Sequence, residues 1–141
     1  MQLRTSLDPG LGASLRDVPV FPGRPQNEGA GYNAQADTFQ RWYALPRQHP
    51  DQVADWYRTA LASSPWTLVD SKLNRRESLS NRPPWKRYCL VAERLAPGGE
   101  SQRFYWEVMG FDREGDYVWV NVSAPRPNNV VCQPYVNQPA A

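Results

Sequence analysis

The chain has 141 residues, of which 40% are apolar and 21% charged, and its formal net charge at pH 7 is +2. This composition predicts one folded domain and excludes a long disordered chain, because enough large apolar side chains are present to offset the entropy of ordering the backbone. The nearly balanced charge excludes a protein held to nucleic acid or to a membrane by its overall charge alone.

Residues 1–37 predict an extended arm, since they are rich in proline and glycine and show no sustained hydrophobic period. Within this arm, Val18 and Val20 alternate with prolines, which predicts a short edge strand or a polyproline segment lying on the domain body. The aromatic run at 37–45 predicts the first regular strand, and Pro46 is expected to end it.

A helix is predicted directly after this strand. Pro50 suits the first helical position, because its φ is already fixed and its missing N–H costs nothing there. Asp51 puts negative charge near the positive end of the helix dipole, and Pro65 ends the helix because it removes a backbone donor. One apolar stripe follows the helical period and predicts the buried side: Val53, Trp56, Tyr57, Ala60 and Leu61.

Alternating apolar and polar side chains predict four further strands, at residues 66–73, 85–95, 102–111 and 117–123. Short hairpin turns join most of them, which forces antiparallel pairing. The predicted fold class is therefore α+β, a two-layer domain with one main helix packed on an antiparallel sheet of about five strands. We expect this domain to span residues 38–123, between the proline-rich N-terminal arm 1–37 and a proline-rich tail at 124–141.

No catalytic or cofactor motif occurs in the sequence. His49 is the only histidine, and its place before the helix predicts an exposed turn residue rather than a catalytic base. Glu93 and Glu107, on adjacent strands, are expected to pair with nearby arginines rather than to act as paired acids. Cys89 and Cys132 leave two alternatives open, a disulfide that ties the tail to the sheet or two unpaired thiols. Because two cysteines and one histidine cannot form the usual zinc sites, we predict a non-enzymatic protein without metal or cofactor.

The densest charge cluster lies at 72–87, where six basic side chains face a single acid. Together with Trp85, this segment could grip a phosphate backbone and stack a base, or contact an acidic protein surface or anionic lipid headgroups. A solvated loop without a partner is the third alternative. The candidate partner-binding residues here are Arg75, Arg76, Arg82, Trp85, Lys86 and Arg87.

The tryptophans form a second group of candidates, because six of them exceed what one core face can hold. Along the first strand, Tyr43 is expected on one face and Trp42 on the other, since side chains alternate along a strand. Both faces carry an aromatic, so at least one aromatic needs cover from an arm, a neighbour or a partner. Trp42, Trp85 and Trp119 therefore need cover from the arms or from a partner. Tryptophan is favoured at interface hot spots and at sugar-binding platforms, so these three are expected to contact a partner.

The lead segment "VPVFPG", a strand, the helix "DQVADWYRTALASSPW" and the following antiparallel strands together resemble a group of small bacterial envelope or lipoprotein-like domains. In that group the helix carries an aromatic–Tyr pair, then Leu, then a Gly-Trp that begins the next strand. Trp56, Tyr57, Leu61 and Trp66 match this pattern, whereas Pro65 stands where glycine is usual. The resemblance covers residues 18–123 and implies a two-layer α+β fold, a non-catalytic role and a location outside the cytoplasm. The chain has no lipobox cysteine, so a lipid anchor is not expected.

These observations predict an accessory subunit that docks into a larger protein assembly through its arms and its exposed aromatics. The alternative is a polyanion-binding module that uses the segment 72–87, with nucleic acid as the less favoured partner. No apolar run reaches the roughly 18 residues that a membrane-spanning helix needs, so a membrane association would be peripheral and through the complex. The first residues show no signal-peptide pattern, and both the bacterial cytoplasm and the envelope stay open as locations. The sequence does not identify the partner.

Overall fold

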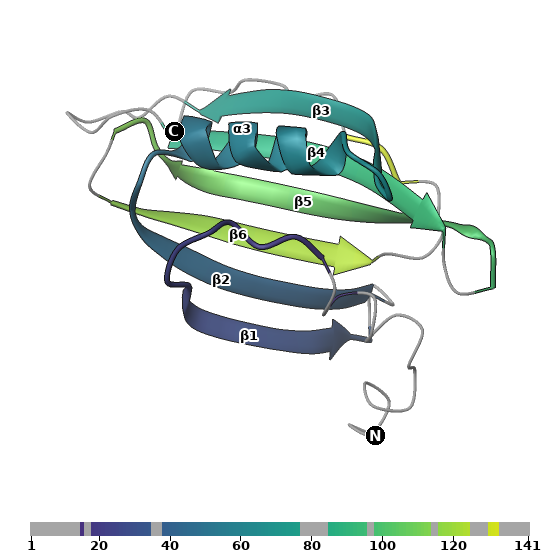
Figure 1. Cartoon of the computed structure of the whole chain (residues 1–141). Helices are drawn as coiled ribbons and strands as arrows, with labels where there is room; N and C mark the ends of the chain where they lie inside the picture. Colours follow the sequence, from purple (N-terminus) through teal and green to yellow (C-terminus); the bar gives the residue numbers. More distant parts are fainter. Residues whose placement is uncertain are drawn as a thin grey trace.

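The protein, seen in a computed structural model, is one helix packed on a six-stranded antiparallel sheet (Figure 1). This confirms the predicted α+β class with its two layers. The structure describes residues 15, 18–34, 38–76, 85–95, 98–113, 116–124 and 130–132.

All neighbouring strands of the sheet pair antiparallel, in the order β1-β2-β6-β5-β4-β3. The last four strands follow one another as neighbours, as their short connections predicted. The bounds are β1 Gln26–Asn33, β2 Thr38–Gln48, β3 Thr67–Arg76, β4 Trp85–Leu95, β5 Ser101–Phe111 and β6 Asp116–Ala124.

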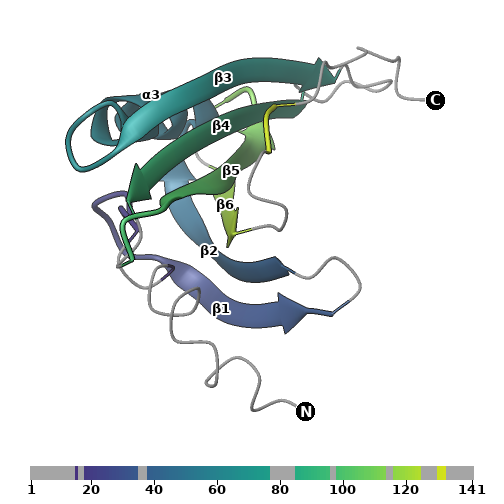
Figure 2. The ribbon, with the colours of Figure 1, turned by 90° about the vertical axis from the view of Figure 1, so that its right-hand side faces the viewer.

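The helix α3 (Pro50–Leu61) begins at the predicted proline. His49 is its N-cap, and the ring Nδ1 accepts a hydrogen bond from the backbone N–H of Asp51 (3.1 Å), which satisfies one of the donors that a helix start leaves open. The helix contacts β3, β4 and β5 on one side of the sheet (Figure 2). Its buried residues are Pro50, Val53, Ala54, Tyr57 and Leu61, whereas the predicted Trp56 is only half-buried.

The main core lies between the helix and the sheet and follows the period-2 alternation of each strand. Phe104, Trp106 and Val108 of β5 are fully buried on this side. The described residues ahead of β1 pack on the same side, beside the helix (Figure 1), through Leu15, Val18, Val20 and Phe21. The backbone N–H of Phe21 donates to the hydroxyl of Tyr57 (3.2 Å), and its ring packs edge-on against Trp56.

Of the two alternatives for the segment around Val18 and Val20, the edge strand is wrong, and a segment lying on the domain body is what the structure has. These residues pack on the core without joining the sheet, and the sixth strand, β1, follows them in the sequence. The sheet therefore begins at Gln26, before the predicted domain start at 38. β1 escaped the sequence prediction because it contains two glycines and few β-branched residues, so its strand propensity is low.

Pro46 does not end the first predicted strand. β2 continues to Gln48, and its register with β6 shifts between Leu45 and Gln48. Arg47 takes a positive φ of 57° at this irregularity. A bulge accepts a proline that regular pairing would reject, because the local ladder is already interrupted there.

The cysteines form a disulfide, Cys89–Cys132, which fixes the described part of the tail to β4. This resolves the alternative that the sequence left open. On the side of the sheet turned away from α3, the disulfide and Val91 form a second small core, with Val69, Tyr105 and Val130 packed against it. The N–H of Cys132 also donates to Oδ2 of Asp70 (2.9 Å). Among the described residues, no helix is long and apolar enough to cross a membrane.

Candidate functional site

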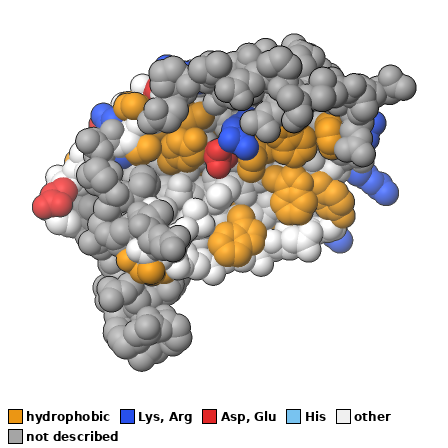
Figure 3. All heavy atoms as spheres, turned by 180° about the vertical axis from the view of Figure 1, so that it is seen from behind, with side chains coloured by type: hydrophobic (Ala, Val, Ile, Leu, Met, Phe, Trp, Pro, Cys, Tyr) orange, Lys and Arg blue, Asp and Glu red, His pale blue; other side chains and the backbone are white. Residues whose placement is uncertain are grey.

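The side of the sheet opposite α3 exposes a group of aromatic side chains (Figure 3). Trp42 is 38% exposed, Tyr117 44% and Trp119 39%. Strand alternation explains their position, since the buried Tyr43 of β2 and Val118 of β6 point to the main core and their neighbours point the other way. We call this surface the aromatic face. It comprises Trp42, Trp85, Met109, Phe111, Arg113, Tyr117 and Trp119.

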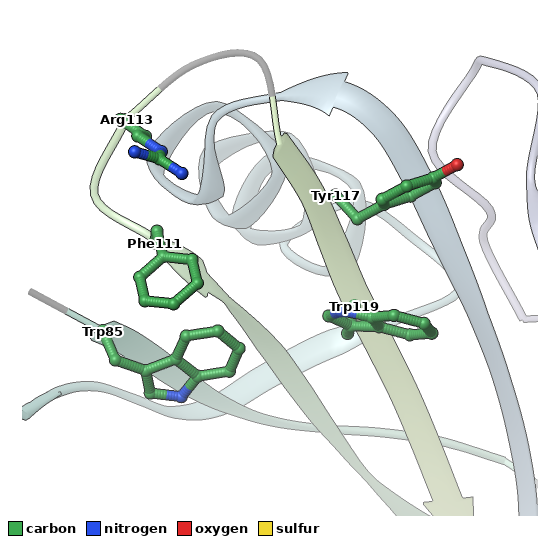
Figure 4. A pocket seen from close by; sticks show the side chains of 5 residues that line it. All are labelled: Trp85, Phe111, Arg113, Tyr117 and Trp119. Carbon is green, nitrogen blue, oxygen red and sulfur yellow. The ribbon is translucent and has the colours of Figure 1, made fainter. Parts of the chain in front are cut away.

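Five of these residues line a shallow pocket of about 210 Å³ (Figure 4). Trp85 of β4 and Phe111 of β5 form one wall, as register partners whose rings meet edge-on at 5.0 Å. Tyr117 and Trp119 of β6 form the other wall, with ring centroids 6.1 Å apart and planes tilted by 34°. Arg113, just after β5, has its Cζ 5.7 Å from the centre of the Phe111 ring.

Two polar side chains in or near this pocket already bind partners within the protein. The Tyr117 hydroxyl donates to Oε1 of Gln26 on β1 (3.0 Å). Further along the face, the guanidinium of Arg87 lies 3.7 Å from the carboxylate of Glu107. Of the five described residues that line the pocket, four are aromatic and the fifth, Arg113, brings a guanidinium. Such a site can bind a ring by stacking and can donate hydrogen bonds to it.

Lys86 differs from the other predicted binding residues. It lies on the helix side of β4, in the same alternation as Tyr88 and Leu90, and is only 8% exposed. Its Nζ lies 2.9 Å from Oδ1 of Asp51 and 3.2 Å from Oδ1 of Asp112. Burial lowers the pKa of Lys86, but the hydrogen bonds to the two carboxylates outweigh burial and raise it. Lys86 therefore makes its ion pairs within its own chain, with Asp51 and Asp112.

The same cluster holds the start of α3 to the sheet. The hydroxyl of Tyr88 donates to Oδ1 of Asp51 (2.5 Å), and Nε2 of His49 lies 3.1 Å from Asp112. Burial raises the pKa of Asp51, but the hydrogen bonds from Tyr88 and Lys86 outweigh it and leave the pKa below its usual range. Burial and the bond to Asp51 raise the pKa of Tyr88.

His49, Asp51 and Asp112 bring three ligand atoms within 4.8 Å of one another, a spacing that suits a metal ion. The ammonium of Lys86 already contacts both carboxylates and supplies the positive charge that a metal would bring. We interpret the cluster as a helix-anchoring ion-pair network.

The other residues considered for chemistry are also engaged. The side chain of His49 is half-buried at the N-cap, not an exposed turn residue. Glu93 pairs with Arg103 (Nε–Oε2, 3.1 Å), as expected of carboxylates on a strand surface, and the cysteines are oxidised.

The structure brings three of the predicted binding residues, Trp42, Trp85 and Trp119, to one face, and Arg87 lies on the same side. Arg75 and Arg76 end β3 opposite Lys86 and Trp85, while their side chains, like all of Arg82, lie outside the described residues. Sequence reasoning missed the pocket residues Phe111, Arg113 and Tyr117. Alternation along the last two strands carried the signal for Phe111 and Tyr117, but only the sheet order brings them beside Trp85.

Comparisons of the chain with protein-family models, with curated proteins and with solved structures find no match. The resemblance to small bacterial envelope domains therefore stays a prediction.

Proposed function

We propose that this protein is a non-catalytic docking subunit that binds a partner protein through its aromatic face. The observation that carries the proposal is a cluster of rings around one pocket, in which Tyr117 and Trp119 are exposed and Trp85 and Phe111 are half-buried. Scattered apolar side chains are normal on a protein surface, whereas a contiguous aromatic group marks an interaction site. Tryptophan and tyrosine also supply much of the binding energy at protein interfaces.

The cysteines and the histidine, the side chains considered for catalysis, already have structural roles, which supports a non-catalytic function. Among the described residues, both cysteines are bound to each other, and the one histidine of the chain caps a helix. A nucleophile needs an adjacent base, and a general base needs access to substrate. Neither condition is met by His49 or by the cysteines.

The proposal rests on the aromatic face more than on the arms. The described part of the N-terminal arm packs on the core of its own domain, and the described part of the tail is tied down by the disulfide. Residues 1–14, 125–129 and 133–141 lie outside the described residues. The disulfide favours an oxidising compartment such as the bacterial envelope, because cytosolic thiols are normally kept reduced.

A polyanion-binding role is the second candidate. It is favoured by Arg113, which lines the pocket with the tryptophans, and by Arg87, which lies on the same side of the sheet. Two observations weaken it. Lys86 is buried in an internal ion-pair network, and Arg87 pairs with Glu107. A polyanion ligand predicts an affinity for single-stranded DNA that falls steeply with salt and weakens when Arg87 and Arg113 are neutralised.

Site-specific photo-crosslinking in the native host tests the proposal. A photoreactive benzoylphenylalanine at Met109 would sit on the aromatic face beside Trp119, its register partner, without removing a pocket wall. The matched control carries the same group at Thr59, on the exposed side of α3. We expect one specific protein adduct from position 109 that the control lacks and that Trp119→Ala suppresses. Equal adducts from both positions, or none from position 109, would contradict the proposal.

A further inference from the structure

The pocket chemistry points to the class of partner segment, and this inference rests on the proposed function. We infer that the pocket between Trp85 and Trp119 binds a proline-rich segment of the partner in the polyproline II conformation. The size, the walls and the hydrogen-bonding groups of the pocket each support this occupant.

The size of the pocket suits one ring at a time. Its volume of about 210 Å³ is below the roughly 300–1,000 Å³ of typical small-molecule sites. It suits a single ring of a longer ligand, such as the pyrrolidine of proline. The pocket is formed at the ends of three neighbouring strands, so the rest of an extended chain can continue over the aromatic face towards Trp42.

The walls of the pocket match known proline-binding grooves in their chemistry. Proline-rich segments dock between aromatic side chains, because the polyproline II helix presents flat apolar rings and is already ordered before it binds. Here Trp85 and Phe111 face Tyr117 and Trp119 across the hollow (Figure 4). Rigid aromatic walls add contact area with little loss of side-chain entropy.

Hydrogen bonding separates proline from other ring ligands. Three of the described lining residues carry N–H donors, the indoles of Trp85 and Trp119 and the guanidinium of Arg113. Within the described part of the chain, neither indole N–H donates to a protein acceptor. Among the described lining residues, no side chain carries a carboxylate or amide oxygen. The single hydroxyl, of Tyr117, donates to Gln26 and keeps its oxygen as an acceptor. A polyproline segment has carbonyl acceptors and no N–H donors, so its polar groups match this lining. Sugar hydroxyls require acceptors as well as donors and match it less well.

The test uses the full chain and a defined peptide, acetyl-GPPPPPPPPG-amide, followed by the indole N–H signals in heteronuclear NMR. The control peptide has the same length, with glycine and serine in place of the prolines. We expect the proline peptide alone to shift the signals of Trp85 and Trp119 in a saturable way at concentrations up to about 1 mM, the weak end of specific recognition. The signal of the buried Trp66, on the helix side, should not move.

Two variants make the outcome specific. Trp119→Ala should weaken peptide binding by roughly thirtyfold, the loss typical of an aromatic hot spot. Leu95→Ala removes an apolar side chain that is 71% exposed at the far end of β4, and it should leave binding unchanged. Binding that survives Trp119→Ala would overturn the inference. So would tighter binding at the same signals by cellohexaose or by a ten-nucleotide oligo(dT).

The two proposals can fail separately. If the proline peptide does not bind while position 109 still gives its specific adduct, the partner class is wrong and the docking function stands. If the peptide binds and suppresses that adduct, both are supported. A chain that self-associates through this face, and becomes monomeric with Trp119→Ala, would assign the pocket to a second copy and overturn the partner assignment.

Discussion

Trp42 lies over Gly29, its cross-strand partner on β1. A Cβ built at Gly29 would fall 2.5 Å from two carbon atoms of the indole and 2.6 Å from its Nε1. The missing side chain therefore lets the ring lie over the strand backbone. Through this pair, the edge strand β1, which was not predicted from the sequence, contacts the aromatic face.

We predict that Gly29→Ala destabilises the fold by about 1–3 kcal/mol, the usual cost of overpacking, because Trp42 must move. Gly31→Ala is the matched control, since its Cβ would lie 3.8 Å from the same indole, an ordinary contact distance. Urea unfolding of both variants measures the difference. In the Trp42→Ala background the cost of Gly29→Ala should largely disappear. Equal losses for the two glycines would show that the ring contact does not matter.

Lys86 and Arg87 are adjacent in sequence, but we expect their substitution to lower the unfolding free energy by different amounts. Lys86→Met leaves Asp51 and Asp112 without their shared cation. We expect a loss of about 1–3 kcal/mol, less than for a fully buried pair because Asp51 is partly solvated. Arg87→Met breaks an exposed pair with Glu107 and should cost no more than about 1 kcal/mol. Chemical denaturation measures the unfolding free energy of both variants. A larger loss of stability for Arg87→Met than for Lys86→Met would refute the assignment of Lys86 as a structural residue.

The ion-pair network predicts a loss of stability in acid. The pKa of Asp51 is lower in the folded protein than its ordinary value of 3.8. The carboxylate therefore stabilises the fold above that value, and this contribution is lost as the pH falls through the lower folded pKa. The gap in unfolding free energy between wild type and Asp51→Asn should be wide at about pH 7 and narrow towards about pH 2. A gap that is independent of pH would mean that Asp51 acts through packing alone.

The disulfide should contribute strongly to stability, because it closes a separation of 43 residues. Chain-entropy arguments give about 4 kcal/mol for a loop of that length. We expect Cys89→Ala with Cys132→Ala to lower the unfolding free energy by up to this amount. Hydrogen exchange should rise at the N–H of Cys132, which bonds to Asp70, while the N–H groups of α3 stay protected. Unchanged exchange at residue 132 would show that other contacts hold the tail.

Replacing a buried tryptophan should lower stability, whereas replacing an exposed one should lower partner binding. Trp106→Ala removes a fully buried ring and should cost about 3–5 kcal/mol. Trp119→Ala should cost less than about 1 kcal/mol while removing the specific adduct from position 109. Thermal unfolding with the crosslinking assay separates the two effects. If Trp119→Ala unfolds the protein, the ring belongs to the fold and not to a binding site.

The sequence by itself determined the parts of the fold that depend on local periodicity. The stripe of α3, its proline start and the alternation of β4, β5 and β6 are properties of neighbouring residues, and side-chain direction follows from them. The number of tryptophans likewise indicated that Trp42, Trp85, Trp106 and Trp119 could not all share one core face with Trp56 and Trp66. The sequence prediction counted Lys86 among the partner-binding residues from its charge, whereas the structure places it on the same side of β4 as Tyr88 and Leu90.

Only the tertiary structure decided which distant residues meet. β1 has too little intrinsic strand preference to be recognised locally, and it forms because β2 offers an edge and Trp42 covers Gly29. The order β2-β6-β5-β4 brings Trp119, Phe111 and Trp85 side by side, although up to 34 positions separate them in the chain. The pairing of Cys89 with Cys132 and of Lys86 with Asp51 likewise depends on this order. Strand pairing joins segments that no local pattern relates, and the pocket and the ion-pair network exist only because of it.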